Sequence, residues 1–216
     1  MVLFLLASMP LTYFFILGIS GQSDQPRQYT LLAVVRGALW AVPATGILAI
    51  LRFLIGEGYS TGRLYLVYGV GEVLAPFIVA GIGIALLERQ SLNSDLSAAL
   101  AGLTSFLAGY LSVLNLFEIV RFLRHFDSAI LFVLPLVRIA FVAAFPLLFL
   151  LAFREQYSTR YMATAMVLGS LVLLSWIPTL YYLSFQVPAL LGSLAVAFGA
   201  GLILPYLGKQ NLPTRR

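Results

Sequence analysis

Glu57-Gly58-Tyr59-Ser60-Thr61-Gly62-Arg63 is repeated about a hundred residues later as Glu155-Gln156-Tyr157-Ser158-Thr159-Arg160, one glycine shorter. An apolar run precedes each of these polar segments. Two arginines bracket each run at the same spacing of 16 residues, Arg36 to Arg52 in the first and Arg138 to Arg154 in the second. Landmarks that recur at fixed spacing indicate a duplicated unit, and a duplication determines how the rest of the chain is interpreted.

The composition predicts a membrane protein. The 216 residues are 61% hydrophobic and 10% charged, whereas soluble domains are roughly half apolar and about a quarter charged. Apolar stretches of about twenty residues recur along the chain, which is the length of a helix that crosses a bilayer core. We therefore expect an all-α polytopic membrane protein whose main partner is the lipid bilayer.

Seven membrane-spanning helices are predicted from the apolar stretches. Their approximate bounds are 2–20, 31–55, 64–87, 96–117, 129–153, 161–183 and 189–207. The segments between them are short and polar, and they leave no room for a soluble domain. No Lys or Arg precedes the first apolar stretch, so we interpret it as a helix and not as a signal peptide.

The repeat predicts two inverted three-helix units. Helices 31–55 and 64–87 match 129–153 and 161–183, and the fourth and seventh spans share a glycine spacing of seven, Gly102 to Gly109 and Gly192 to Gly199. A unit with an odd number of helices enters the membrane from opposite sides when it is repeated, as in many secondary transporters. The expected divisions are an N-terminal helix (1–21), repeat 1 (31–117), repeat 2 (129–207) and a basic tail (208–216).

The distribution of Lys and Arg among the loops predicts the orientation. One side collects seven of these residues and the other side four, Arg52, Arg63, Arg121 and Arg124. Because cytoplasmic loops carry the excess of positive charge, the C-terminus is expected in the cytoplasm and the N-terminus outside. We expect a bacterial inner (plasma) membrane.

Three charged residues, Glu72, Arg138 and Arg36, lie five or more residues inside the ends of predicted spans. Glu72 lies eight residues into the third span and Arg138 nine residues into the fifth. At about 1.5 Å per residue, the two have nearly the same depth and could pair. Arg36 is the repeat counterpart of Arg138, but Glu72 has no acidic counterpart. The excess of arginine favours an anionic ligand. The alternatives are a packing salt bridge between Glu72 and Arg138, and an Arg36 side chain that extends to the membrane surface.

One proline and two tyrosines also indicate a site around Glu72. Pro76 cannot donate a hydrogen bond to the carbonyl of Glu72, four residues earlier. A carbonyl freed within a membrane needs a side chain, water or ligand. Tyr68 lies one turn from Glu72, and Tyr110 reaches a similar depth, so both are candidate binding residues, whereas Asn115 and Trp176 are expected at the membrane interface.

Several chemistries are not expected from this sequence. The chain has no cysteine and one histidine, His125, so neither a metal site nor a cofactor such as haem is predicted. Basic runs with interleaved aromatic residues are missing, which disfavours a nucleic-acid partner. No nucleophile has an activating base nearby in a span, so we do not expect an enzyme.

The sequence thus predicts a small-solute transporter or channel, with an anionic solute favoured. Its candidate substrate-binding residues are Glu72, Arg138, Arg36, Tyr68 and Tyr110. The alternative is a non-catalytic integral subunit that anchors or assembles a larger complex of partner membrane subunits. Short loops and stripes of small residues, such as Ser193, Ala197 and Gly201, suit that alternative equally well.

Overall fold

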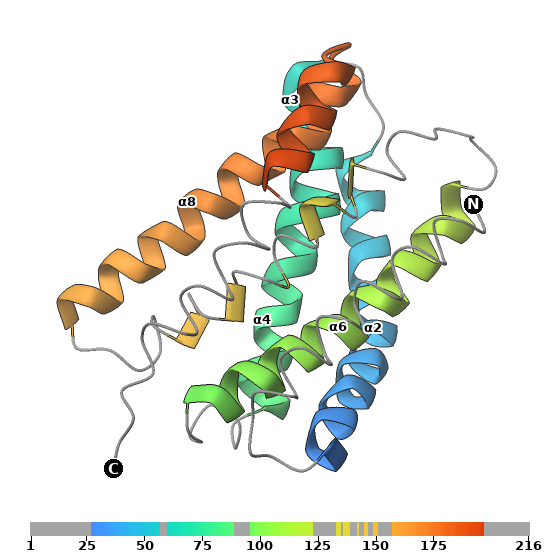
Figure 1. The fold of residues 1–216 in the computed structure, drawn as a ribbon. Helices are drawn as coiled ribbons and strands as arrows, with labels where there is room; N and C mark the ends of the chain where they lie inside the picture. The colour runs from blue at the N-terminus through green and yellow to red at the C-terminus, as the bar shows by residue number, and fades with distance from the viewer. Residues whose placement is uncertain are drawn as a thin grey trace.

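The computed structural model describes residues 27–56, 60–88, 96–122 and 157–196, with short pieces between 133 and 150. Within these residues every regular element is a helix (Figure 1). Three helices are long and apolar enough to cross a membrane, Leu31–Ile55, Thr61–Leu87 and Ala98–Phe117. The predicted helical class is confirmed for this part of the chain, and these three helices are compatible with an integral membrane location.

These three helices correspond to the second, third and fourth predicted spans. The sixth corresponds to a longer helix whose apolar part is Leu168–Tyr182, and the start of the seventh lies in the helix Gln186–Val196. The span 2–20, most of 129–153 and the tail 208–216 lie outside the described residues. The seven-helix arrangement and the inverted repeat therefore stay predictions.

Local signals explain where the first helices end and begin. Helix α2 (Arg27–Ile55) stops at Gly56, whose φ of 69° belongs to the left-handed region that glycine adopts readily. The repeated polar segment follows. Within it Ser60 caps the short helix α3 (Thr61–Leu64) by accepting a hydrogen bond from the backbone N–H of Arg63. The last residues of the polar segment therefore begin the next helix.

The chain continues without a break through three helical segments. Helix α3 leads into a π-helix, η1 (Tyr65–Leu74), which leads into α4 (Ala75–Leu87). Two further long helices follow, α6 (Leu96–Phe122) and α8 (Tyr157–Tyr182). Figure 1 shows α8 on one side of the η1–α4 helix and α2 on the other, with α6 crossing α2 obliquely. The η1–α4 helix therefore has neighbours on both sides.

Glycines allow α2 and α6 to meet backbone to backbone. A Cβ atom on Gly37 would lie 2.0 Å from the carbonyl oxygen of Phe106, and one on Gly109 would lie 2.0 Å from that of Val34. Both distances are far below van der Waals contact. Small residues at helix crossings let membrane helices approach closely, which matters because lipid tails compete with every apolar side chain.

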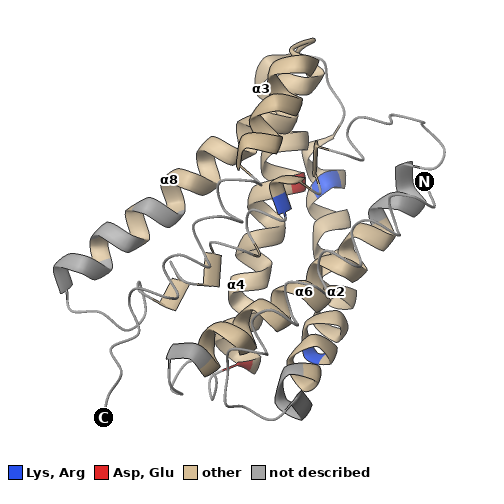
Figure 2. Ribbon diagram, viewed as in Figure 1, with Lys and Arg blue, Asp and Glu red and all other residues tan. Residues whose placement is uncertain are grey.

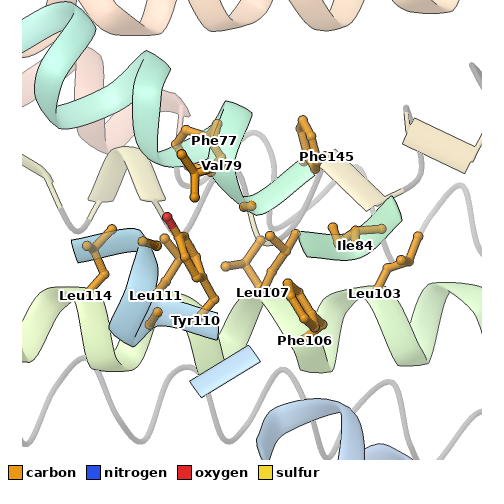
Figure 3. Packing of buried hydrophobic residues seen from close by; sticks show 14 of the residues in the cluster. Phe77, Val79, Ile84, Leu103, Phe106, Leu107, Tyr110, Leu111, Leu114 and Phe145 are labelled. Carbon is orange, nitrogen blue, oxygen red and sulfur yellow. The ribbon is translucent and has the colours of Figure 1, made fainter. Parts of the chain in front are cut away.

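The core lies where α6 faces α4. Six large side chains of α6 are almost completely buried and point toward α4 (Figure 3): Leu103, Phe106, Leu107, Tyr110, Leu111 and Leu114. From the opposite side α4 contributes Phe77, Val79 and Ile84. Close packing of this kind fixes how far each helix is rotated about its own axis, and so decides which polar groups meet.

The outer faces are apolar. On α2, Leu31 is 68% exposed, Phe53 86% and Leu54 77%, and on α8 Leu173 is 72% exposed. Exposed apolar surface on this scale marks a contact with lipid or with another protein. It agrees with the membrane location that the composition predicts.

Candidate functional site

Glu72 lies in the irregular part of the third helix. The segment Tyr65–Leu74 is a π-helix of 10 residues, and the N–H of Ala75 still bonds five residues back, to the carbonyl of Val70. π-Helices are rare and occur frequently at functional sites. The Glu72 side chain is 0% exposed. The predicted intramembrane acid is therefore inside the bundle and not on its lipid-facing surface.

Arg52 forms an ion pair with the buried carboxylate. Its Nη2 lies 2.5 Å from Oε2 of Glu72. Arg52 belongs to the last turn of α2, and its side chain is 16% exposed. It is thus the member of the pair that reaches the surface of the bundle.

Arg138 contacts the main chain of Glu72. Its Nη2 donates to the backbone carbonyl of Glu72 at 3.1 Å, and its Nη1 donates to Oδ1 of Asn115 at 2.5 Å. Pro76 has no N–H to offer the carbonyl four residues earlier, which is that of Glu72. The guanidinium of Arg138 supplies the hydrogen bond that the sequence predicted would be needed there.

The resulting cluster, which we call the Glu72 cluster, consists of Glu72, Arg52, Arg138 and Asn115. It joins three elements and a fragment of the segment between α6 and α8, and Figure 2 shows charged ribbon segments together near the α3 end of the bundle. Two guanidinium groups and one carboxylate meet here. Buried charges are costly unless they are paired, and attraction between them is strong where water is excluded.

The two tyrosines of the predicted site flank this cluster. The Tyr110 side chain is fully buried, and its hydroxyl donates to the carbonyl of Pro76 at 2.9 Å. This bond holds α6 against the start of α4. The ring of Tyr68 stacks on that of Tyr182, with ring centroids 3.5 Å apart. Tyr68 therefore links η1 to α8.

Helix α8 contacts η1 through further polar and aromatic groups. The hydroxyls of Tyr65 and Ser175 lie 3.0 Å apart, and the Tyr65 ring stacks on Trp176 with centroids 4.5 Å apart. A Cβ atom on Gly69 would lie 2.8 Å from the carbonyl oxygen of Ser175. The π-helix and α8 thus come into close contact at Gly69, and Trp176 faces a tyrosine of η1.

The structure does not bring Arg36 to Glu72. Nη1 of Arg36 lies 3.3 Å from Oε1 of Glu88, at the other end of the hairpin that α2 forms with η1–α4. Arg36 and Arg52 are 16 residues apart in α2, so the two ends are separated by about 24 Å, less than the roughly 30 Å of a bilayer core. Of the five predicted site residues, Glu72, Arg138 and Tyr110 share one neighbourhood, Tyr68 adjoins it, and Arg36 is remote.

Sequence reasoning missed Arg52 and Asn115 as neighbours of Glu72, although a signal for Arg52 exists. The two arginines of α2 are 16 residues apart (36 to 52), and so are the two glutamates of the next helix (72 to 88). An antiparallel hairpin with one fixed register pairs the ends crosswise, Arg36 with Glu88 and Arg52 with Glu72. No comparable spacing pointed to Asn115.

A metal site has no structural support in the described part of the chain. Within it no three His, Cys, Asp or Glu side chains gather where they could hold a metal ion. With the geometry established, comparison with known proteins adds no assignment. No protein-family model, no curated protein and no solved structure matches this chain. The Glu72 cluster is therefore the candidate functional site of the described residues.

Proposed function

We propose that this protein carries a small anionic solute across the membrane, as a transporter or channel, and that the solute binds at the Glu72 cluster. The observation that carries the proposal is the meeting of two guanidinium groups, Arg52 and Arg138, at one fully buried glutamate. Arginine presents a planar fork of donors that matches carboxylate and phosphate oxygens, and it stays charged when buried.

The surrounding backbone supports a binding role for the cluster. A π-helix that contains Glu72 and changes to an α-helix just before Pro76 resembles the broken helices that form solute sites in membrane transporters. Irregular backbone at membrane depth is tolerated where protein or water satisfies its polar groups. Here Arg138 satisfies the carbonyl of Glu72, so the same guanidinium serves both the backbone and the charge balance of the site.

The placement of the repeated arginines supports an inverted duplication of three helices. Arg36 and Arg138 are counterparts in the repeat, yet Arg36 contacts Glu88 and Arg138 contacts Glu72, at opposite ends of η1–α4. Inversion places equivalent residues at opposite membrane faces. We extend the proposal to seven membrane-spanning helices in the bacterial inner membrane, with the N-terminus outside and the C-terminus in the cytoplasm.

The experiment compares matched variants at the two ion pairs. Purified full-length protein is tested for thermal stabilisation in detergent, and for uptake in proteoliposomes, with four anions: pyruvate, phosphate, sulfate and chloride. At least one anion is expected to stabilise the wild type, and Arg52→Gln is expected to weaken its binding at least about tenfold, or 1.4 kcal/mol. Arg36→Gln, at the remote pair, is expected to bind as the wild type does.

Two results would overturn the proposal. One is a wild-type protein that binds and transports none of the four anions. The other is equal loss of binding in Arg52→Gln and Arg36→Gln, which would mean that neither arginine contacts the solute specifically. If the inactive wild type also copurifies with another membrane protein in fixed stoichiometry, the anchoring subunit becomes the better function.

A further inference from the structure

We infer that Asn115 binds the solute directly, through the N–H groups of its side-chain amide, and that the solute is an oxyanion. The inference rests on the proposed transport function and adds to it a specificity-determining residue and the class of anion. It follows from the orientation of the Asn115 amide and from which members of the Glu72 cluster reach the surface.

The contact with Arg138 fixes the orientation of the Asn115 amide. A guanidinium carries N–H donors and no acceptor, so the amide atom that faces it must be the oxygen. Oδ1 of Asn115 accordingly accepts from Nη1 of Arg138 at 2.5 Å. The amide nitrogen belongs to the same planar group and carries two N–H donors. These donors are therefore directed away from Nη1 and offer hydrogen bonds on the other side of the amide.

The four members of the Glu72 cluster differ in exposure. Glu72 is 0% exposed and Arg138 is 2% exposed, so both are enclosed. The side chain of Arg52 is 16% exposed, and Asn115 is partly exposed, so these two reach the surface of the bundle. A solute that approaches the cluster from outside therefore meets the guanidinium of Arg52 and the amide of Asn115 before it meets the buried carboxylate.

Arg52 and Asn115 also lie near the ends of helices that are long enough to span a membrane. Arg52 is three residues before the end of Leu31–Ile55, and Asn115 is two residues before the end of Ala98–Phe117. At about 1.5 Å per residue, each lies within about 5 Å of the end of its helix. Helix ends lie at the polar surface of a bilayer, where water is present. Both groups are thus open to an anion from the aqueous phase.

The donors of these two residues suit an anion that has several oxygens. A guanidinium presents a planar fork of N–H groups that matches two oxygens of one carboxylate, phosphate or sulfate. A further oxygen of the same anion can accept from the amide N–H of Asn115, along a direction of its own. Chloride is a single atom and cannot fill both positions. We therefore expect oxyanions to bind at least about tenfold more tightly than chloride, or 1.4 kcal/mol.

The decisive experiment observes the amide itself, by NMR of the full-length wild-type protein in detergent. The chain has three asparagines, Asn93, Asn115 and Asn211. Labelling of asparagine with nitrogen-15 therefore gives three side-chain NH2 groups, and the group that disappears in Asn115→Gln is that of Asn115. At least one of pyruvate, phosphate and sulfate is expected to move the Asn115 proton signals downfield, because a hydrogen bond to an anion is short and strong. The other two groups are internal controls and should not move.

The variant Asn115→Asp separates solute binding from the support of Arg138. Its carboxylate keeps an oxygen for Nη1 of Arg138 but has no N–H to donate. Resistance to SDS is expected to be no lower than that of the wild type, whereas oxyanion affinity is expected to fall at least about tenfold, or 1.4 kcal/mol. The control is Leu116→Ala, the exposed neighbour on α6, which should bind as the wild type does. Because the NMR measurement uses the wild type, poor folding of Asn115→Asp leaves the test intact.

The outcomes separate the two proposals. Failure of the wild type to bind or carry any of the four anions overturns both. An oxyanion that stabilises the protein without moving the Asn115 signals leaves the transport function standing and overturns the contact with Asn115, as does wild-type affinity in Asn115→Asp. Chloride that binds as tightly as the best oxyanion overturns the class of solute.

Discussion

The two ends of the hairpin formed by α2 and η1–α4 carry the same pair of residue types in different surroundings. At one end Arg36 is 37% exposed and pairs with Glu88 at the end of a regular α-helix. At the other end Arg52 pairs with Glu72 on a π-helix, and Arg138 and Asn115 join them. The first pair joins an arginine that is partly exposed to a glutamate that is only 2% exposed, whereas the second pair is enclosed in a polar network.

The two ends also differ in the contacts that hold their helices together. Near Arg36 the helices are in direct contact: Gly37 meets α6, and the indole of Trp40 covers Gly83 and donates to the carbonyl of Val79 at 2.9 Å. Near Glu72 the helices also pack closely, at Gly69, but polar groups from Arg52, Arg138 and Asn115 are added to this packing. Close packing therefore contributes at both ends, and electrostatic contacts in an enclosed polar network are added at the Glu72 end. Under the proposed function, a solute binds at this end by replacing one of these polar contacts.

The largest difference in stability is expected between variants of the two glutamates, Glu72 and Glu88. Glu72→Gln should lower the free energy of unfolding by about 3–5 kcal/mol, because it leaves arginine charge buried without its carboxylate. Glu88→Gln should cost about 1 kcal/mol or less, because Arg36 remains in contact with water. Unfolding by SDS, followed by the fluorescence of the two tryptophans, measures both values. Equal losses would remove the distinction between the ends.

The next largest loss of stability is expected for a variant of Asn115, which belongs to the Glu72 cluster. Asn115→Ala removes an amide acceptor from a charged donor, Nη1 of Arg138, and should cost about 1.5–3 kcal/mol. The neighbouring Leu116 is 43% exposed, so Leu116→Ala is a control that should cost under about 1 kcal/mol, since lipid replaces its contacts. A loss for Leu116→Ala as large as that for Asn115→Ala would contradict the network. The same SDS titration applies.

Close packing at the other end is tested with glycines of α2. Gly37→Ala should destabilise by about 1–3 kcal/mol, because the new methyl group would collide with the backbone of α6. Gly46→Ala meets nothing within 4 Å and should stabilise the helix by up to about 1 kcal/mol. Thermal unfolding in detergent gives the sign of each change. A neutral Gly37→Ala would show that the backbones of α2 and α6 are not in contact at Gly37.

The smallest effect is expected for the tyrosine that joins α6 to α4. Tyr110→Phe keeps the ring and removes the hydroxyl that bonds the carbonyl of Pro76, so it should cost about 0.5–1.5 kcal/mol. Tyr161 is 71% exposed, and Tyr161→Phe should change stability by no more than about 0.5 kcal/mol. Indistinguishable stabilities for the two variants would indicate that the Tyr110 hydroxyl contributes nothing at the polar end.

Part of the candidate site could be predicted because it depends on position along single helices. Hydropathy located the third helix, and counting residues along it placed Glu72 inside the membrane, where a carboxylate must be enclosed. The spacing from Glu72 to Pro76 predicted a carbonyl that needs an external donor, and Arg138 is that donor. The depth of Tyr110 placed it in the same neighbourhood, where its hydroxyl bonds Pro76.

The partner of the Glu72 carboxylate could not be predicted in this way. Arg138 was the expected partner because it lies about as many residues inside its predicted span as Glu72 does. The structure instead pairs the Glu72 carboxylate with Arg52, from the end of α2. Which arginine meets the side chain and which meets the backbone depends on the rotation of each helix about its axis. The π-helix changes that rotation for every residue beyond it, and hydropathy carries no sign of a π-helix.

By itself the sequence determined that the chain forms apolar helices long enough to cross a bilayer, and how deep each charge lies along them, because both follow from composition and a fixed rise per residue. Only the tertiary structure decided that Arg52 and Arg138 meet at Glu72 while Arg36 is held at Glu88. Partners on different helices are chosen by packing at contacts such as Gly37 and Gly109, where backbones touch and one rotation alone avoids collision.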